Sequence, residues 1–319
     1  MNDASAEAIR HARRFRKVVI WGLRRWWHSH RFIHQGFFQT FRYLRIPVVW
    51  TDFSDDPGII EPGDFVITSN AYGRGIPRDT TLAPLRNGAF YCFHGYAHSG
   101  YDGDDRLPRH EIDRAHSLNL EVYTDRAKLA SHQWDTVTHF DKPSKTLYQP
   151  WGTNLSAERF RAPVTPRSPF VFWVGAIWNN DLNQGNRAEI AELRSVLRHR
   201  SLRFVHLKFI PDWVSIAAIR RSRVAPAIAG RWQVENNYLP CRMFKNISYG
   251  QVGISNVPQF CDIYRNCTIP GRSISELIDN ALSLSSKDVV EVVKAQQKIT
   301  REHTYVQKIR NIFRAAAES

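Results

Sequence analysis

A cation, an apolar helix face and a glycine follow one another in a fixed order between residues 238 and 256, YLPCRMFKNISYGQVGISN. Arg242 stands at the expected start of a helix, and Gly250 ends it before a short apolar run. A guanidinium at a helix N-terminus suits a diphosphate, because its fork of donors adds to the unpaired N–H groups of the first turn. The segment therefore predicts a nucleotide-phosphate site. A surface arginine in an ordinary αβ unit fits the spacing equally well.

Histidines at the ends of predicted strands in the first half could supply a catalytic base. His28 and His30 follow the strand KVVIWGL at 17–23, and His94 ends the run GAFYCFH at 88–94. Histidine titrates near neutral pH and can accept the proton of a hydroxyl group. His94 is the preferred base, because a parallel strand delivers its last residues to the edge where ligands bind; His28 and His30 come next. No carboxylate partner lies at a usable spacing from these histidines, so no metal site is predicted.

Short apolar strands alternate with helical segments in both halves of this 319-residue chain. In the first half we expect strands at 17–23, 46–50, 64–68, 88–94 and 120–124. A proline-rich stretch at 141–169 interrupts the pattern, which restarts with PFVFWVGAIW at 169–178. Such alternation indicates a mostly parallel sheet in each half. We therefore predict an α/β protein with two Rossmann-like domains, 1–150 and 151–319, and with helices at the C-terminus.

The composition favours an anionic partner without choosing one. The net charge is +14, from 44 Lys and Arg against 30 Asp and Glu, which suits nucleic acid, an anionic membrane surface or a phosphorylated substrate. The four cysteines lack zinc or CxxC spacing and are expected to be reduced thiols. No apolar run approaches the roughly 18 residues of a membrane span, so we expect a cytoplasmic protein that can rest on the inner face of a membrane. No G-x-S-x-G, P-loop or H-E-x-x-H motif occurs, which argues against hydrolase, kinase and metalloprotease functions.

The two αβ halves, the proline-bearing linker and the segment R-x-F-K-N-I-S-Y-G together resemble a GT-B glycosyltransferase. The resemblance implies that the two Rossmann-like domains face each other across a cleft. In that fold family an apolar helix at the donor site ends at a glycine, and some members place a basic residue near its start. Arg242, eight residues before Gly250, occupies that basic position. The resemblance implies that Arg242 holds the diphosphate of a nucleotide sugar and neutralises the charge that grows as the nucleotide leaves. Lys245 stands where members with a Glu-x7-Glu motif carry an acid, so the resemblance does not extend to that group.

Further donor-side candidates follow from the rule that ligands bind beyond the carboxyl ends of parallel strands. In the second half, Gly175 and Lys208 end predicted strands, and Asn179 lies in the loop behind the first of these strands. The other candidates are Tyr238, Lys245 and Asn246, which accompany Arg242. Each also fits an ordinary turn, loop or surface role.

The resemblance implies transfer of a sugar from a nucleotide-sugar donor to a hydroxyl of a glycan or lipid-linked acceptor, without a metal or other cofactor. The alternative function is nucleic-acid binding, in which the Arg and Trp residues contact phosphates and stack on bases. A DNA-modifying glycosyltransferase would satisfy both interpretations.

Overall fold

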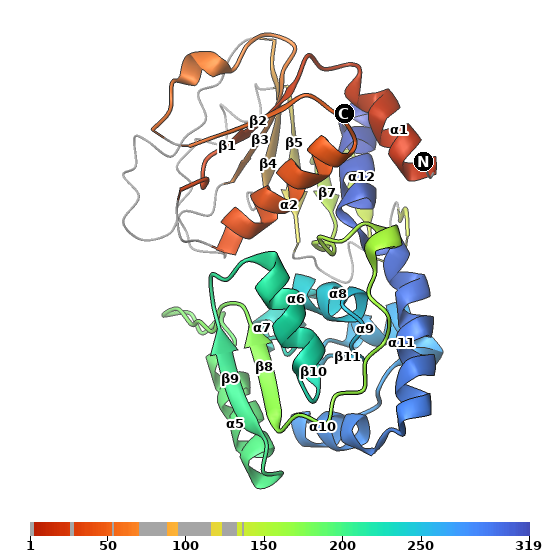
Figure 1. Ribbon diagram of the computed structural model, residues 1–319. Helices are drawn as coiled ribbons and strands as arrows, with labels where there is room; N and C mark the ends of the chain where they lie inside the picture. Colours follow the sequence, from red (N-terminus) through yellow and green to blue (C-terminus); the bar gives the residue numbers. More distant parts are fainter. Residues whose placement is uncertain are drawn as a thin grey trace. The chain divides into compact units, whose positions relative to one another are not determined.

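The computed structural model describes residues 3–25, 29–52, 54–69, 88–94, 116–122, 133–135 and 137–319. These residues form two compact units, drawn in Figure 1. Unit 1 comprises the described residues up to Val122, those of Leu129–Gln149, and Tyr305–Ser319; unit 2 contains Pro150–Thr304. The C-terminal segment thus returns to unit 1, whereas the sequence placed it with the second domain.

Unit 1 is built on a seven-stranded sheet. Its order is β2 (Val48–Thr51), β1 (Val18–Trp21), β3 (Phe65–Ser69), β4 (Phe90–His94), β5 (Ser117–Glu121), β7 (Thr146–Tyr148) and β6 (His139–Asp141). All neighbouring strands pair in parallel except β6, which is antiparallel to β7. The central strands are buried and rich in Val, Ile and Phe, as a sheet with parallel pairing requires. The predicted mostly parallel sheet is confirmed for this unit.

The last helix, α12 (Tyr305–Glu318), belongs to unit 1 because its apolar face completes the core there. The Phe313 ring lies 5.0 Å from that of Phe65 on β3 and 5.9 Å from that of Phe41 on α2 (Ser29–Tyr43), measured between centroids. The N-terminal helix α1 (Asp3–Ala12) packs along α12. Aromatic pairs at these distances add to the gain from burying their large apolar surfaces. The sequence showed that this helix is amphipathic, but not which core it covers.

Unit 2 contains two short parallel strand pairs joined by helical crossovers. β8 (Phe170–Val174) pairs with β9 (Arg203–Leu207), and β10 (Ala225–Pro226) pairs with β11 (Gly253–Ile254). The connecting helices are α5 (Arg187–His199), α6 (Asp212–Arg221), α7 (Arg231–Glu235) and α8 (Cys241–Ser248). The helices α9 (Pro258–Tyr264), α10 (Ile274–Ser283) and α11 (Ser286–Thr300) follow. Strands alternate with helices as predicted, but Pro226 has no N–H with which to extend the ladder, so the strands do not form one continuous sheet.

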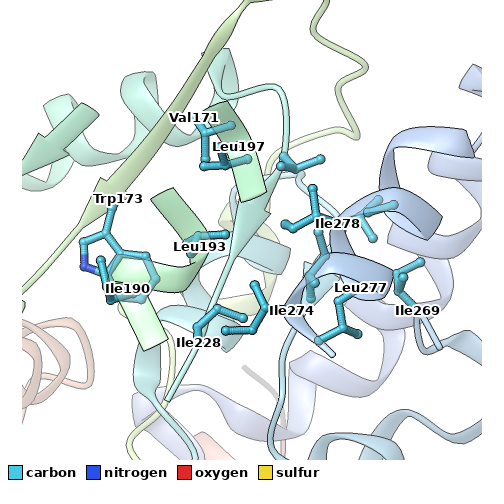
Figure 2. Packing of buried hydrophobic residues seen from close by; sticks show 14 of the residues in the cluster. Val171, Trp173, Ile190, Leu193, Leu197, Ile228, Ile269, Ile274, Leu277 and Ile278 are labelled. Carbon is cyan, nitrogen blue, oxygen red and sulfur yellow. The ribbon is translucent and has the colours of Figure 1, made fainter. Parts of the chain in front are cut away.

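The hydrophobic core of unit 2 joins β8, α5 and α10, as Figure 2 shows. Val171 and Trp173 on β8 face Leu193 on α5, while Leu277 and Ile278 on α10 close the other side. Each fully buried aliphatic side chain of this kind contributes roughly 1.5–3 kcal/mol. The core holds β8 firmly, and the end of β8 is where the candidate site begins.

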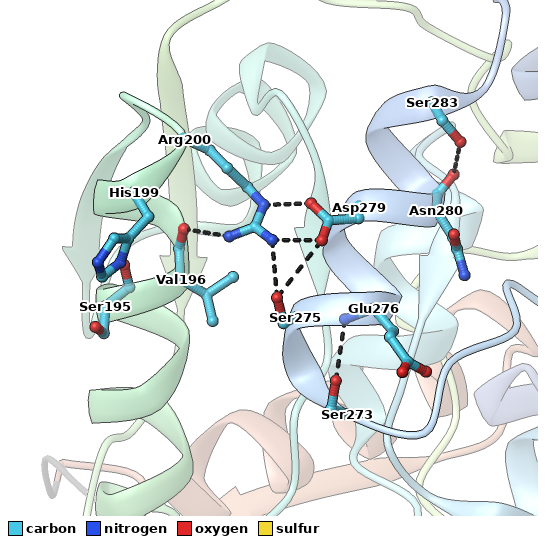
Figure 3. A network of polar contacts seen from close by, with 10 residues as sticks. All are labelled: Ser195, Val196, His199, Arg200, Ser273, Ser275, Glu276, Asp279, Asn280 and Ser283. Atoms are coloured by element: carbon cyan, nitrogen blue, oxygen red, sulfur yellow. Dashed lines mark hydrogen bonds and ion pairs between the residues drawn. The ribbon is translucent and has the colours of Figure 1, made fainter.

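An arginine–carboxylate pair ties α5 to α10 at the surface of unit 2, as shown in Figure 3. Arg200, directly after α5, donates from Nε and Nη2 to the two carboxylate oxygens of Asp279. The same guanidinium donates to Ser275 Oγ and to the Val196 carbonyl oxygen, both at 2.8 Å. The hydrogen bonds from Arg200 hold the pKa of Asp279 below its ordinary value. This bidentate geometry is the strongest form of a surface ion pair.

Asp279→Asn is expected to lower the thermal midpoint at pH 7 and to make stability less dependent on acid pH. Because the folded-state pKa lies below the ordinary 3.8, the ionised carboxylate stabilises the fold above pH 3.8. That contribution is lost as the pH falls through the folded-state pKa. The thermal midpoints of the variant and the wild type should therefore converge in strong acid. Thermal unfolding between pH 2 and pH 7 measures the difference. Asp262→Asn, on the exposed surface of α9, is the control; an equal effect there would refute the role of the pair.

Candidate functional site

Arg242 lies in the first turn of α8, at the carboxyl end of β8. Its Nε donates to the carbonyl oxygen of Val174, the last residue of β8, at 3.3 Å. Its guanidinium carbon lies 4.0 Å from the centroid of the Trp173 ring, a cation–π contact. Burial lowers the pKa of Arg242, yet an arginine remains charged at any ordinary pH. The protein therefore holds a fixed positive charge at the strand edge where ligands of α/β folds bind.

Gly175 makes room for this guanidinium. Its φ is +130°, and a Cβ at this position would lie 2.7 Å from Nη2 of Arg242. Its N–H donates to the carbonyl oxygen of Leu207 at 3.0 Å, and its own carbonyl accepts from Nε2 of His206 at 2.7 Å. The backbone after β8 is thus held against β9 on one side and against Arg242 on the other. The structure brings Gly175 and Arg242 together, as the site prediction requires.

Gly175→Ala is expected to displace the Arg242 guanidinium while the fold is retained. The new methyl group meets the far end of a flexible side chain rather than backbone, so the arginine can move aside. Positive φ adds strain of about 1–3 kcal/mol for a residue with a Cβ. If Arg242 forms the nucleotide-phosphate site predicted from the sequence, binding of a nucleoside diphosphate should weaken about tenfold or more, measured by calorimetry. Unchanged affinity would contradict the coupling between Gly175 and Arg242.

The rest of α8 is anchored by its inner face and its C-terminus. Asn246 is 3% exposed, and its Nδ2 donates to the Ala225 carbonyl oxygen of β10 at 2.8 Å. Ser248 Oγ lies 2.7 Å from Thr153 Oγ1. Among the predicted donor-side residues, Asn246 therefore joins α8 to β10, whereas Lys245 is half-buried on the same helix.

Gly250 ends α8 where the last part of the linker, residues 160–169, passes the helix. Its φ is +92°, and a Cβ there would lie 2.3 Å from the Ala162 carbonyl oxygen. The N–H of Arg161 donates to the Ser248 carbonyl at 2.8 Å, and that of Val164 donates to the Gly250 carbonyl at 2.9 Å. The predicted helix and its terminal glycine are confirmed. The glycine serves a left-handed helix end and a close approach of the linker.

The other donor-side candidates of unit 2 occupy the loops around this edge. Asn179 accepts from the Gly185 N–H at 3.1 Å through Oδ1 and donates to Asn183 Oδ1 at 2.9 Å, so its amide shapes its own loop. Lys208 follows β9 and is exposed, with Nζ 4.4 Å from the Phe209 ring centroid. Tyr238 is half-buried and close enough to Arg242 to influence its pKa.

The predicted bases of unit 1 are only partly described. His94 is the last residue of β4 and pairs with Leu120 on β5. His30 lies in the first turn of α2, and His28 lies outside the described residues. His94 thus lies at the carboxyl end of a parallel strand, which is the reason it was preferred. Its role as a base stays a prediction.

Sequence reasoning missed three residues at the strand ends. Trp173, whose ring contacts the Arg242 guanidinium, is 1% exposed. His206, which pairs with Trp173 on the adjacent strand β9, is hydrogen-bonded to the Gly175 carbonyl. Glu121, the last residue of β5, is 2% exposed, and its Oε1 accepts from the Val122 N–H at 3.1 Å. A carboxylate at a parallel-strand end was a usable signal, but the expected strand ran on to residue 124. The described residues contain no group of three or more His, Cys, Asp or Glu that could hold a metal ion.

The cysteines and the lengths of the helices bear on two other expectations from the sequence. Each of the four cysteines is free, from the buried Cys92 to the exposed Cys261. Among the helices that the structure describes, none has the length and apolar character that a membrane crossing needs.

Comparison with known proteins shows a likeness in fold and none in sequence. No family model and no curated protein matches this chain. A solved structure of a DNA-modifying β-glucosyltransferase, studied with and without uridine diphosphoglucose, is similar with a TM-score of 0.53 and 12% identity. The similarity covers 95% of this chain and 100% of that one. The N-terminal domain of a Candida albicans trehalose-6-phosphate phosphatase aligns over 100% of this chain and 94% of its own length, at 9% identity and a TM-score of 0.48, which carries no argument.

The likeness to the glucosyltransferase extends over nearly the whole of this chain. It therefore includes the mostly parallel seven-stranded sheet of unit 1. At such low identity a structural match establishes fold and not activity. The predicted resemblance is therefore confirmed at that level: this chain has an α/β fold similar to that of the DNA-modifying β-glucosyltransferase.

Proposed function

We propose that this protein transfers a sugar from a nucleotide-sugar donor to a hydroxyl acceptor, with Arg242 holding the diphosphate. The observation that carries the proposal is the fixed guanidinium of Arg242, at the end of β8 and the start of α8. A rigid fork of donors matches a diphosphate, and no reorganisation is needed as negative charge grows on the leaving nucleotide. The fold shared with a glucosyltransferase supports the same reaction class.

The surrounding residues have separate roles in this proposal. Gly175 keeps backbone close to the phosphates, and Lys208 adds a second cation beyond the end of β9. Tyr238 and Asn179 line the approach of the nucleoside, and Lys245 is a further contact from α8. Asn246 positions α8 through Ala225 instead of touching the donor, because its amide is already bonded in the core.

The acceptor hydroxyl must lose a proton as its oxygen attacks the anomeric carbon and the bond to the diphosphate breaks. We assign that proton to His94, at the carboxyl end of β4, with His30 and His28 as the other histidines of the first half. His94→Gln should abolish sugar transfer and leave nucleotide binding unchanged. Retained transfer in that variant would shift the assignment to another group, for which Glu121 at the end of β5 is the first to test.

A thermal-shift screen tests the donor class. UDP, GDP, CDP and ADP, each with and without a sugar, are titrated against the full chain at constant salt. A ligand that binds only the folded state raises the unfolding midpoint, by an amount that grows with the ratio of its concentration to Kd. One nucleotide should stabilise the protein at millimolar concentration, and the matching sugar nucleotide should be hydrolysed slowly in the absence of an acceptor. A flat response to every nucleotide would refute the proposal.

The acceptor has two candidates. A glycan or lipid-linked hydroxyl follows from the sequence resemblance, with an anionic membrane as the place of reaction. The net charge of +14 favours DNA instead, since a polyanion gains strongly from a basic protein, and the similar glucosyltransferase modifies DNA. Radiolabelled donor incubated with duplex DNA or with lipid-linked glycan distinguishes them. Label in DNA, with binding that weakens steeply as salt rises, would select the DNA acceptor.

A further inference from the structure

A cavity of about 270 Å³ lies at the opposite ends of the unit 2 strands from Arg242. Arg223, on its wall, directly precedes β10 and donates its N–H to the carbonyl of Phe170, the first residue of β8, at 2.7 Å. Val252, also on the wall, directly precedes β11. The linker and the turn between α10 and α11 complete the lining, and Figure 1 shows the linker passing this end of unit 2 before it enters β8.

The charge on the cavity wall is positive and uncompensated. Arg167 and Arg223 both line it, no lining residue is acidic, and neither arginine forms an ion pair with a described carboxylate. Arg223 uses Nη1 to donate to the Pro166 carbonyl oxygen at 3.1 Å, which orients its guanidinium. Two arginines on the wall of one cavity suit a doubly charged anion, because each guanidinium presents several donors in a rigid fork.

Hydroxyl groups and a helix end add to this positive wall. Thr165 lies in the linker part of the wall, and Ser286 is the first residue of α11. The first-turn N–H groups of a helix favour negative charge. The nearby carboxylate of Asp288 is engaged by Ser285, which donates to it from Oγ at 2.7 Å and closes the N-terminal cap.

The rest of the wall is mixed, because the polar residues Gln251 and Ser285 lie beside apolar side chains. The apolar part is formed by Val164, Val224, Val252, Leu282, Leu284 and Val289. A free inorganic anion would leave this surface in contact with water, whereas an apolar group attached to the anion would cover it. We propose that this cavity binds an organic phosphate, a phosphomonoester with a small apolar or aromatic body, whose phosphate contacts Arg167 and Arg223. The inference does not depend on the proposed transferase reaction, because the strands separate this cavity from Arg242.

Phenyl phosphate is the probe for this site, titrated into the full chain by isothermal calorimetry at low salt. One molecule should bind per chain, several-fold more tightly than inorganic phosphate and at least tenfold more tightly than phenol. Arg167→Gln and Arg223→Gln should each weaken binding at least tenfold. Arg198→Gln removes the same charge from the exposed face of α5 and should bind phenyl phosphate like the wild type. Since Arg167 is exposed and bonded to no described group, its variant tests the site even if loss of the Pro166 contact impairs folding of Arg223→Gln.

Arg242→Gln separates this cavity from the donor site. Normal affinity for phenyl phosphate in that variant supports two independent sites, and loss of affinity there would overturn the proposal. Equal affinities for inorganic and phenyl phosphate would overturn it as well, because the apolar wall would then contribute nothing. Undetectable binding at 10 mM probe, a concentration on the order of the weakest useful Kd, would do the same.

Discussion

Arg242→Gln is expected to reduce nucleotide affinity by roughly 10- to 100-fold, and sugar transfer by about 10²- to 10³-fold, with the fold intact. The first figure corresponds to the loss of charge-assisted hydrogen bonds, and the second to the loss of a preorganised group that meets growing charge. The fold should survive because α8 is held elsewhere, through Asn246 to β10 and through Ser248 to Thr153. Calorimetry with the nucleotide found in the screen, and initial rates of transfer, measure the two effects.

Two matched variants make this result specific. Arg242→Lys keeps the charge but loses the planar fork, so it should retain more affinity than the glutamine variant and still transfer slowly. Arg198→Gln removes one positive charge from the exposed face of α5 and should behave as the wild type. If the Arg242 and Arg198 glutamine variants weaken nucleotide binding equally, general electrostatic attraction would explain the affinity and the assignment of Arg242 would be wrong.

Gly250→Ala is expected to cost about 3 kcal/mol or more of stability. The residue must adopt φ +92°, which an L residue disfavours, and its Cβ would lie 2.3 Å from the backbone oxygen of Ala162. The linker cannot move aside freely, because its Arg161 and Val164 N–H groups are bonded to the end of α8. Urea unfolding followed by tryptophan fluorescence should show a markedly lower midpoint.

Gly63→Ala separates backbone strain from steric conflict. Gly63 has a similar φ of +84°, but the nearest atom to an added Cβ is Arg16 Cβ at 3.9 Å. The free energy of unfolding of Gly63→Ala should therefore fall only by the strain of a positive φ, on the order of 1 kcal/mol. Equal losses in the two variants would show that the linker yields, contrary to the packing seen at Gly250.

The local pattern of the chain was largely predictable. The helix before Gly250 and the alternation of strands and helices follow from short-range preferences, because hydrophobic period and helix-end residues act within a few positions. The end of β5 was placed too late, because LEVYT at 120–124 has apolar residues that fit a strand on their own, whereas the described ladder stops at Glu121. Pairing with β7, a long-range event, decides that boundary.

Positions in three dimensions were harder to predict where they depend on distant partners. Lys308 on α12 is a basic residue in a polar stretch of the sequence, yet it is 1% exposed, and burial lowers its pKa to about 8. Asn246 looked like a possible nucleotide contact until β10 supplied the Ala225 carbonyl for its amide. In both cases the residue type was visible in the sequence, while its surroundings came from segments far along the chain.

The sequence by itself determined that a basic residue would open a helix ending at Gly250, within an α/β chain of predominantly parallel character. Those features depend on local backbone preference and hydrophobic period. Only the tertiary structure decided that Arg242 rests on Trp173 beside Gly175, and that the C-terminal helix completes the core of unit 1. The reason is physical: packing selects among the faces that local preference leaves equivalent, and it does so through contacts between residues that the chain separates by dozens of positions.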